Sequence, residues 1–292
     1  MTDSILLDQI GQRMKAFRLG AGLSPEELAK LAGISRAAIY RYESGQPPKV
    51  DTLSSIAGIL GVSLPTLFGV GNEYISSAVS YFERMRQLEE NVEHISVLFG
   101  PVSYLLTTDI YDEMLPHVLR ESIPEDVVNR ALALKEVEQL LEILHARKSS
   151  FQKRKPSIVS LVSLAQLQQF ARLGFIGSHN PPGISKAKRR DAAMTEIENI
   201  IYLLRCQPIG VQIGIVVDSI PNSSYQLFKQ SDITHVAVSP YSLGTFANVR
   251  IGVATITAAP EAALLYNSVT SQLWNNSIKG EEAAQMLESV VG

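Results

Sequence analysis

The sequence predicts a multidomain protein with an all-α N-terminal domain of five helices, a helical linker region and an α/β (or α+β) C-terminal domain. Helix start and stop signals follow one another closely over residues 6–68. Apolar residues then recur at helical spacing as far as about residue 151. Beyond residue 155, runs of β-branched residues alternate with helical segments. We therefore expect domains at residues 1–70, 71–155 and 156–292.

Composition and charge limit the function classes. The 292 residues carry a net charge of −3 and one cysteine, Cys206. Because the chain is not basic overall, nucleic-acid binding would have to come from local placement of charge. A single cysteine excludes a disulfide within the chain, and we expect it to be a small buried side chain in a reducing compartment. No run approaches the roughly 20 apolar residues of a membrane span, so we expect a cytoplasmic protein without a metal site.

The first 68 residues show five helix signals. Ile10, Met14 and Phe17 recur at helical spacing in a first helix over about residues 6–19. The second begins with an N-cap serine, Ser24, followed by a proline at the first helical position and by Glu27, which completes a capping box. The three later helices are expected to be capped by Ser35, Asp51 and Ser63 and to end near Gly45, Leu60 and Phe68.

The third helix has two unlike faces. At about 100° per residue, Ile39 and Tyr42 fall on one side and can pack on the preceding helix. The other side presents hydrogen-bond donors on a short projecting helix, which is what the major groove of DNA admits. An arginine fork suits guanine O6 and N7, and an alanine can contact the methyl group of thymine. The outward residues are Ala37, Tyr40, Arg41 and Ser44, with Arg36 at the flank.

Residues 7–68 resemble the lambda-repressor/Cro, or XRE-type, helix-turn-helix domain. The resemblance rests on IGQRMKAFRLGAGLSPEELAKLAGISRAAIYRYESG and TLSSIAGILGVSLPTLF, roughly a fifth of the chain. It implies a five-helix lambda-repressor-like fold and a repressor-type regulator that binds double-stranded DNA as a homodimer on a palindromic site. The family usually has glutamine where this chain has Pro25, so the resemblance implies weaker phosphate anchoring at that position.

The resemblance also implies roles for individual residues. Some positions would read bases, others would hold phosphates, and one pair would join the first helix to the third. The base-reading residues are Arg36, Ala37 and Arg41, with Tyr40 near base or phosphate. The phosphate-holding residues are Ser24, Gln46 and Lys49. The structural ion pair is Arg18 with Glu43.

The middle region, residues 71–155, is predicted to be helical. Apolar residues from Ile75 to Ile95 recur at steps of three and four, which predicts one long amphipathic helix over residues 74–99. We expect it to be half core and half dimer interface. Residues 125–151 show a second long helical pattern, and breaks are expected near Gly100-Pro101 and Pro116.

The C-terminal region alternates strands and helices. Its order is similar to the uncharacterised C-terminal domain of large XRE-type regulators. That similarity implies a regulatory domain that dimerises and senses a small-molecule effector or a partner protein, and it names no ligand or cofactor. Strands are expected at residues 157–163, 211–219, 233–239 and 249–257, and helices at residues 164–174, at 192–206 and on both sides of Gly280.

Two clusters of basic residues allow two interpretations, one functional and one purely structural. They could contact DNA or an anionic effector, or they could be solvated helix and loop ends. One cluster comprises Arg147, Lys148, Lys153, Arg154 and Lys155. The other comprises Lys186, Lys188, Arg189 and Arg190.

Enzyme motifs are missing from the sequence. It contains no G-x-G-x-x-G, Walker A, H-E-x-x-H or G-x-S-x-G pattern. We therefore expect a transcriptional regulator and no enzyme. Two alternatives stay open: an enzyme-like C-terminal domain with a regulatory DNA-binding head, and a protein-interaction or antitoxin-like scaffold that binds DNA only to regulate its own gene.

Overall fold

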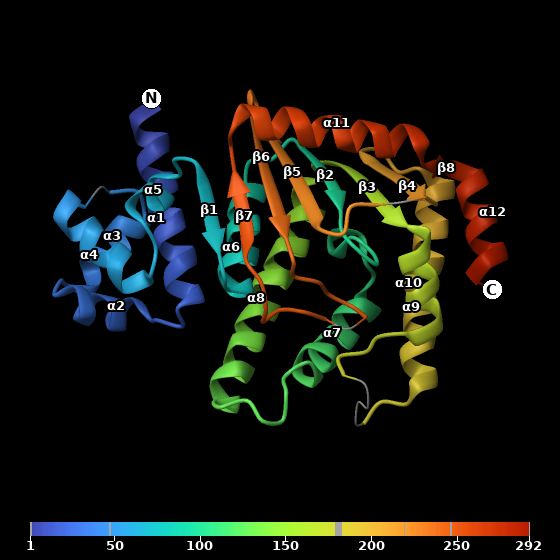
Figure 1. Ribbon diagram of the computed structural model, residues 1–292, viewed down its shortest axis with the longest axis horizontal. Helices are drawn as coiled ribbons and strands as arrows, with labels where there is room; N and C mark the ends of the chain where they lie inside the picture. Colours follow the sequence, from blue (N-terminus) through green and yellow to red (C-terminus); the bar gives the residue numbers. More distant parts are fainter. Residues whose placement is uncertain (1, 47, 179–182, 219, 246, 292) are drawn as a thin grey trace.

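The described part of the first 70 residues forms five helices that make a lobe at one side of the molecule (Figure 1). We call this lobe the head. In the computed structural model, residues 2–46, 48–178, 183–218, 220–245 and 247–291 are described, without the side chains of residues 2–8 and 291. The helices of the head are α1 (Thr2–Gly20), α2 (Pro25–Ala32), α3 (Arg36–Glu43), α4 (Val50–Leu60) and α5 (Leu64–Phe68).

The remainder of the chain, which we call the body, is built on one mixed sheet. Within the described residues the strand order is β1-β7-β6-β5-β2-β3-β4-β8, with β2, β3 and β4 parallel to one another and every other neighbouring pair antiparallel. The strands are β1 (Asn72–Ile75), β2 (His94–Leu98), β3 (Ser157–Ser163), β4 (Val211–Val216), β5 (Ser224–Gln230), β6 (Ile233–Ser239), β7 (Ala254–Thr257) and β8 (Ile278–Lys279).

Helices pack on both faces of this sheet. One face carries Leu161, Tyr225 and Leu227, which pack against α11 (Pro260–Asn276). The other helices of the body contribute to the main hydrophobic core on the opposite side of the sheet. These are α6 (Ala78–Glu89), α7 (Asp109–Glu121), α8 (Arg130–Arg154), α9 (Leu164–Leu173), α10 (Lys186–Cys206) and α12 (Gly280–Val291), with a short 3-10 turn at Tyr104–Leu106.

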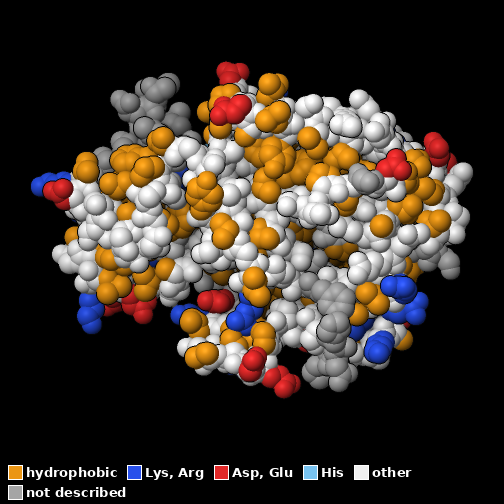
Figure 2. All heavy atoms as spheres, in the orientation of Figure 1, with side chains coloured by type: hydrophobic (Ala, Val, Ile, Leu, Met, Phe, Trp, Pro, Cys, Tyr) orange, Lys and Arg blue, Asp and Glu red, His pale blue; other side chains and the backbone are white. Residues whose placement is uncertain are grey.

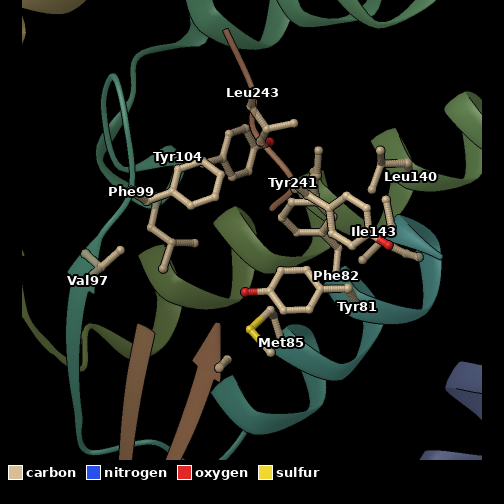
Figure 3. Packing of buried hydrophobic residues seen from close by; sticks show 14 of the residues in the cluster. Tyr81, Phe82, Met85, Val97, Phe99, Tyr104, Leu140, Ile143, Tyr241 and Leu243 are labelled. Carbon is tan, nitrogen blue, oxygen red and sulfur yellow. The ribbon is translucent and has the colours of Figure 1, made fainter. Parts of the chain in front are cut away.

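The main core is aromatic. Tyr81 and Phe82 of α6 lie with their ring centroids 5.2 Å apart, and Tyr81 also lies 5.7 Å from Tyr241. Leu140 and Ile143 of α8 pack beside them (Figure 3). Burial of such rings is the main stabilising contribution of a core of this kind, and here it fixes α6 and α8 against each other.

The head joins the body through α1 and β1. Helix α1 packs on α6, where the Ser80 hydroxyl donates to the Ala16 carbonyl at 3.1 Å and the Gln87 amide donates to the Gln12 carbonyl at 3.0 Å. Strand β1 follows the head directly and pairs with β7. The head is therefore attached to the body by side-chain contacts as well as by the chain connection.

The prediction of one long helix over residues 74–99 is wrong. Its residues form β1, α6 and β2, because Ser77 caps α6 by accepting from the Ser80 amide at 3.4 Å and a turn follows Glu89. Strand β2 is buried on both faces, so its apolar run continued the helical spacing by coincidence. The region 71–155 is thus not a purely helical linker, since it supplies two strands of the sheet. The boundaries at residues 70 and 155 stay a prediction.

Smaller sequence expectations also need correction. Pro116 lies inside α7 and does not break it, because buried neighbours such as Leu115 and Leu119 hold the helix in place. Lys49 occupies the N-cap of α4, and Asp51 lies within its first turn. Cys206 is exposed at the end of α10. Strand β5 was not predicted, and the run 249–257 is a strand only from Ala254 onward.

Other expectations agree with the structure. The predicted strands at residues 157–163 and 233–239 coincide with β3 and β6, and the one at 211–219 corresponds to β4. Two closing helices are present, but α11 ends at Asn276 and β8 separates it from α12, which begins at Gly280. The overall class, an all-α head followed by an α/β region, is confirmed.

Candidate nucleic-acid interface

A tight turn joins α2 to α3. At the start of α2, the Ser24 hydroxyl accepts from the Glu27 amide at 3.2 Å while the Glu27 carboxylate accepts from the Ser24 amide at 2.7 Å. Gly33 ends α2 in the left-handed conformation with φ of 66°, which glycine adopts without strain. Ser35 then caps α3 by accepting from the Ala38 amide at 3.2 Å. These local bonds fix the direction in which α3 leaves the turn.

The inner face of α3 is buried in the head. Ile39 is 0% exposed and Ala38 is 5% exposed. They lie with Leu28 and Ala29 of α2, which are also buried. Small residues at this contact allow the two helices to approach closely, as the sequence indicated.

The outer face of α3 projects into solvent. Arg36, Ala37, Tyr40 and Arg41 are all exposed. The Arg36 guanidinium donates to the Tyr40 hydroxyl at 3.0 Å, and its Cζ lies 5.4 Å from the centre of the Tyr40 ring. This hydrogen bond raises the pKa of Arg36 above its usual value. The structure therefore places the four residues on one open surface with two of them in contact.

Arg18 and Glu43 form a buried, bidentate ion pair. Arg18 Nε lies 2.6 Å from Glu43 Oε1, and Nη2 lies 3.0 Å from Oε2. The Arg18 Nη1 also donates to the Leu23 carbonyl at 2.8 Å. The side chains are 5% and 7% exposed, so this is no surface pair. It joins α1 to the last residue of α3 and so fixes α3 on the rest of the head.

The three residues expected at phosphates lie around α3. Ser24 stands at the start of α2, whereas Gln46 and Lys49 follow the end of α3, and all three are exposed. The Gln46 amide donates to the Arg41 carbonyl at 3.0 Å, which holds that segment against the helix. Glu26 is exposed close to Arg36, so the surface is mixed in charge.

Three members of the two basic clusters are buried inside the body, which neither interpretation of the sequence foresaw. Arg147 is 2% exposed and its Nη2 lies 2.6 Å from Glu89 Oε1. Lys148 Nζ lies 2.6 Å from Asp112 Oδ2, and Arg189 pairs with Glu121. Their acidic partners lie on other helices, so no local sequence signal announced them. The exposed members are Lys153, Arg154, Lys155, Lys186, Lys188 and Arg190.

Across the residues that the structure describes, no three His, Cys, Asp or Glu side chains come together as a metal site would require. None of the helices in the described ranges combines the length and apolar character needed to cross a membrane.

A short helix with a buried inner face, an open outer face bearing guanidinium groups and a tight turn before it defines a helix-turn-helix DNA-binding domain. Residues 14–67 match the family model described as helix-turn-helix. The chain is also 26% identical over 116 residues to the SPbeta prophage-derived uncharacterized HTH-type transcriptional regulator YonR of Bacillus subtilis (strain 168), a match that covers 39% of this chain and 97% of that protein. The head therefore carries a helix-turn-helix domain of the XRE type, and the two matches support a DNA-binding transcriptional regulator.

Proposed function

We propose that the protein binds a palindromic DNA operator as a homodimer, represses transcription there, and changes its DNA affinity when its body binds a small-molecule effector or a partner protein. The observation that carries this proposal is the open outer face of α3, which presents Arg36 and Arg41 on a rigidly held helix. We further propose that the protein works in the cytoplasm by binding alone, without catalysis.

Base reading is assigned to Arg36 and Arg41. Replacing either by alanine is expected to cost about 1–3 kcal/mol of binding free energy on the true operator and to relax base preference at one position of each half-site. Dissociation constants measured on the operator and on single-base variants check this. Arg120→Ala, which removes an exposed arginine of α7, is the matched control and should change neither quantity. Unaltered base preference in both head variants would remove these residues from the base-reading set.

Phosphate contact is assigned to Ser24, Gln46 and Lys49. Lys49→Ala is expected to weaken binding to all DNA sequences by a similar factor, because phosphates carry no sequence information. It should also reduce the slope of log affinity against log salt by about 1. Affinity measured at several salt concentrations on operator and random DNA checks this, with the exposed Lys153 at the far end of α8 as the control substitution. A loss confined to the operator would contradict the assignment.

Pairing of two copies is supported by the exposed side of α11. Of its 17 residues only Glu261 is charged, and Leu264 and Leu265 are 72% and 65% exposed. Figure 2 shows hydrophobic side chains at the surface along the upper edge of the molecule, where α11 lies. Exposed apolar patches of this kind mark protein interfaces, and a two-fold operator requires a second copy.

The Leu264→Glu variant tests that pairing. A charge on the apolar side of α11 is expected to raise the dimer dissociation constant at least about tenfold, because the carboxylate would be desolvated on association. Sedimentation velocity at several concentrations measures it. Leu132→Glu on α8, where the leucine is 44% exposed, is the matched control. Equal dissociation constants for the two variants would show that α11 does not form the interface.

A further inference from the structure

A cleft of about 640 Å³ lies between the head and the body. Its head side is formed by α1 and by Ser44 and Gly45, which directly follow the recognition helix. Its body side is formed by the last turn of α6, the segment just after it and the hairpin between β5 and β6. A volume of this size suits a small molecule. The cleft therefore touches both parts whose relative placement decides where α3 points.

The inner wall of the cleft carries an excess of positive charge. Arg13 Nε and Arg84 Nε each lie 2.8 Å from an oxygen of the same carboxylate, that of Glu73. All three side chains are at least nine-tenths buried. The one carboxylate of Glu73 balances only one of the two guanidinium groups. Among the described residues that line the cleft, the acidic one is Asp232, which is exposed.

Two buried polar atoms beside this wall have no hydrogen-bond partner within the described residues. They are Arg13 Nη1 and His235 Nδ1. Burial, followed by the nearby charge of Arg84, lowers the pKa of His235 to about 4, so its ring is neutral at pH 7. Unsatisfied buried donors are uncommon and costly in folded proteins, and they are found where a ligand or ion completes the site.

The rest of the lining is rich in side-chain amides. Gln9 contributes one from α1, Asn91 one from the segment after α6 and Gln230 one from β5. Amide NH₂ groups donate to oxygen acceptors. The combination of surplus guanidinium charge and amide donors selects for a ligand that is anionic and carries several oxygen atoms.

We propose that this cleft binds a small, oxygen-rich anion through a carboxylate or phosphate group placed at Arg13 and Arg84, and that the anion is the effector of the regulator. The second part rests on the proposed function. A molecule in the cleft contacts α1 and the end of α3 on one side and the body on the other. It therefore shifts the orientation of the recognition helix to the extent that it binds one arrangement more tightly.

Calorimetric titration of the full chain with citrate, inorganic phosphate and glucose at fixed ionic strength tests the site. Saturable binding of citrate or phosphate with no binding of glucose is the expected result, and the anion that binds more tightly identifies the group. Asn91→Glu, which adds a carboxylate at an exposed position of the wall, should weaken that binding at least about fivefold. Asn275→Glu, exposed on α11, is the control and should leave it unchanged. No saturable anion binding, binding of glucose alone, or equal effects of the two variants would overturn the proposal.

A second measurement separates this proposal from the DNA-binding one. Operator affinity is determined with and without the bound anion, and anion affinity with and without operator. Thermodynamic linkage makes the two ratios equal, and coupling between the sites makes both differ from 1. Anion binding without any effect on operator affinity would overturn the effector role. Operator binding in a protein that binds no anion would overturn the cleft while leaving DNA recognition intact.

Discussion

Replacing Glu73 by alanine is expected to lower the free energy of unfolding by about 3–5 kcal/mol, the largest effect that we predict for a single substitution. The carboxylate accepts Arg13 Nε at 2.8 Å and Arg84 Nε and Nη2 at 2.8 and 2.9 Å. Without it, two guanidinium groups would remain buried beside each other with no counter-charge. Chemical denaturation of the full chain measures the loss.

The Glu73 carboxylate also makes stability depend on pH. Burial alone would raise its pKa, but the charges and hydrogen bonds of Arg84 and Arg13 outweigh burial and lower the pKa to about 2, from a usual value of 4.5. Because the folded-state pKa is depressed, the stabilising contribution is complete above about pH 4.5 and is lost as the pH falls toward 2. The difference in stability between wild type and Glu73→Ala should therefore shrink over that range.

The matched control for Glu73 is Glu138→Ala. Glu138 is 53% exposed and pairs with Arg120 at 2.7 Å on the surface. Exposed pairs contribute about 0–1 kcal/mol, so this variant should unfold almost as wild type does. If Glu73→Ala were equally mild, the ion-pair group between head and body would not hold them together.

Ile39→Ala is expected to destabilise the head by about 2–5 kcal/mol. Ile39 is fully buried where α3 packs on α2, so truncation loses contacts and leaves a cavity. Hydrogen exchange or denaturation followed by a probe in the head measures the change, and DNA binding should fall with it. Leu31→Ala removes a leucine that is 60% exposed and should be close to neutral. Unchanged melting of the head in Ile39→Ala would contradict the packing of the recognition helix.

Features set by neighbouring residues could be predicted from the sequence. The caps at Ser24, Ser35 and Ser63 depend on bonds that reach no further than three residues along the chain. The two faces of α3 followed from helical spacing, and the exposed fractions agree with it. Local chemistry was thus sufficient to predict these caps and the exposure of the outer face of α3.

Features set by partners that are distant in the sequence could not be predicted from it. Strand β2 pairs with β3 and β5, from residues more than 60 and more than 125 positions away, and its double burial leaves no alternation to recognise. The buried roles of Arg147 and Arg189 depend on acids brought close by tertiary packing. The cleft between head and body arises only once α1 lies on α6.

Enrichment of DNA sequences from a random pool by the purified full chain tests the central claim most directly. The account predicts one enriched motif made of two inverted half-sites about one helical turn apart, with base preference that relaxes at the same half-site position in Arg36→Ala or Arg41→Ala. A pool without an enriched motif, or a motif that both variants select unchanged, would contradict it.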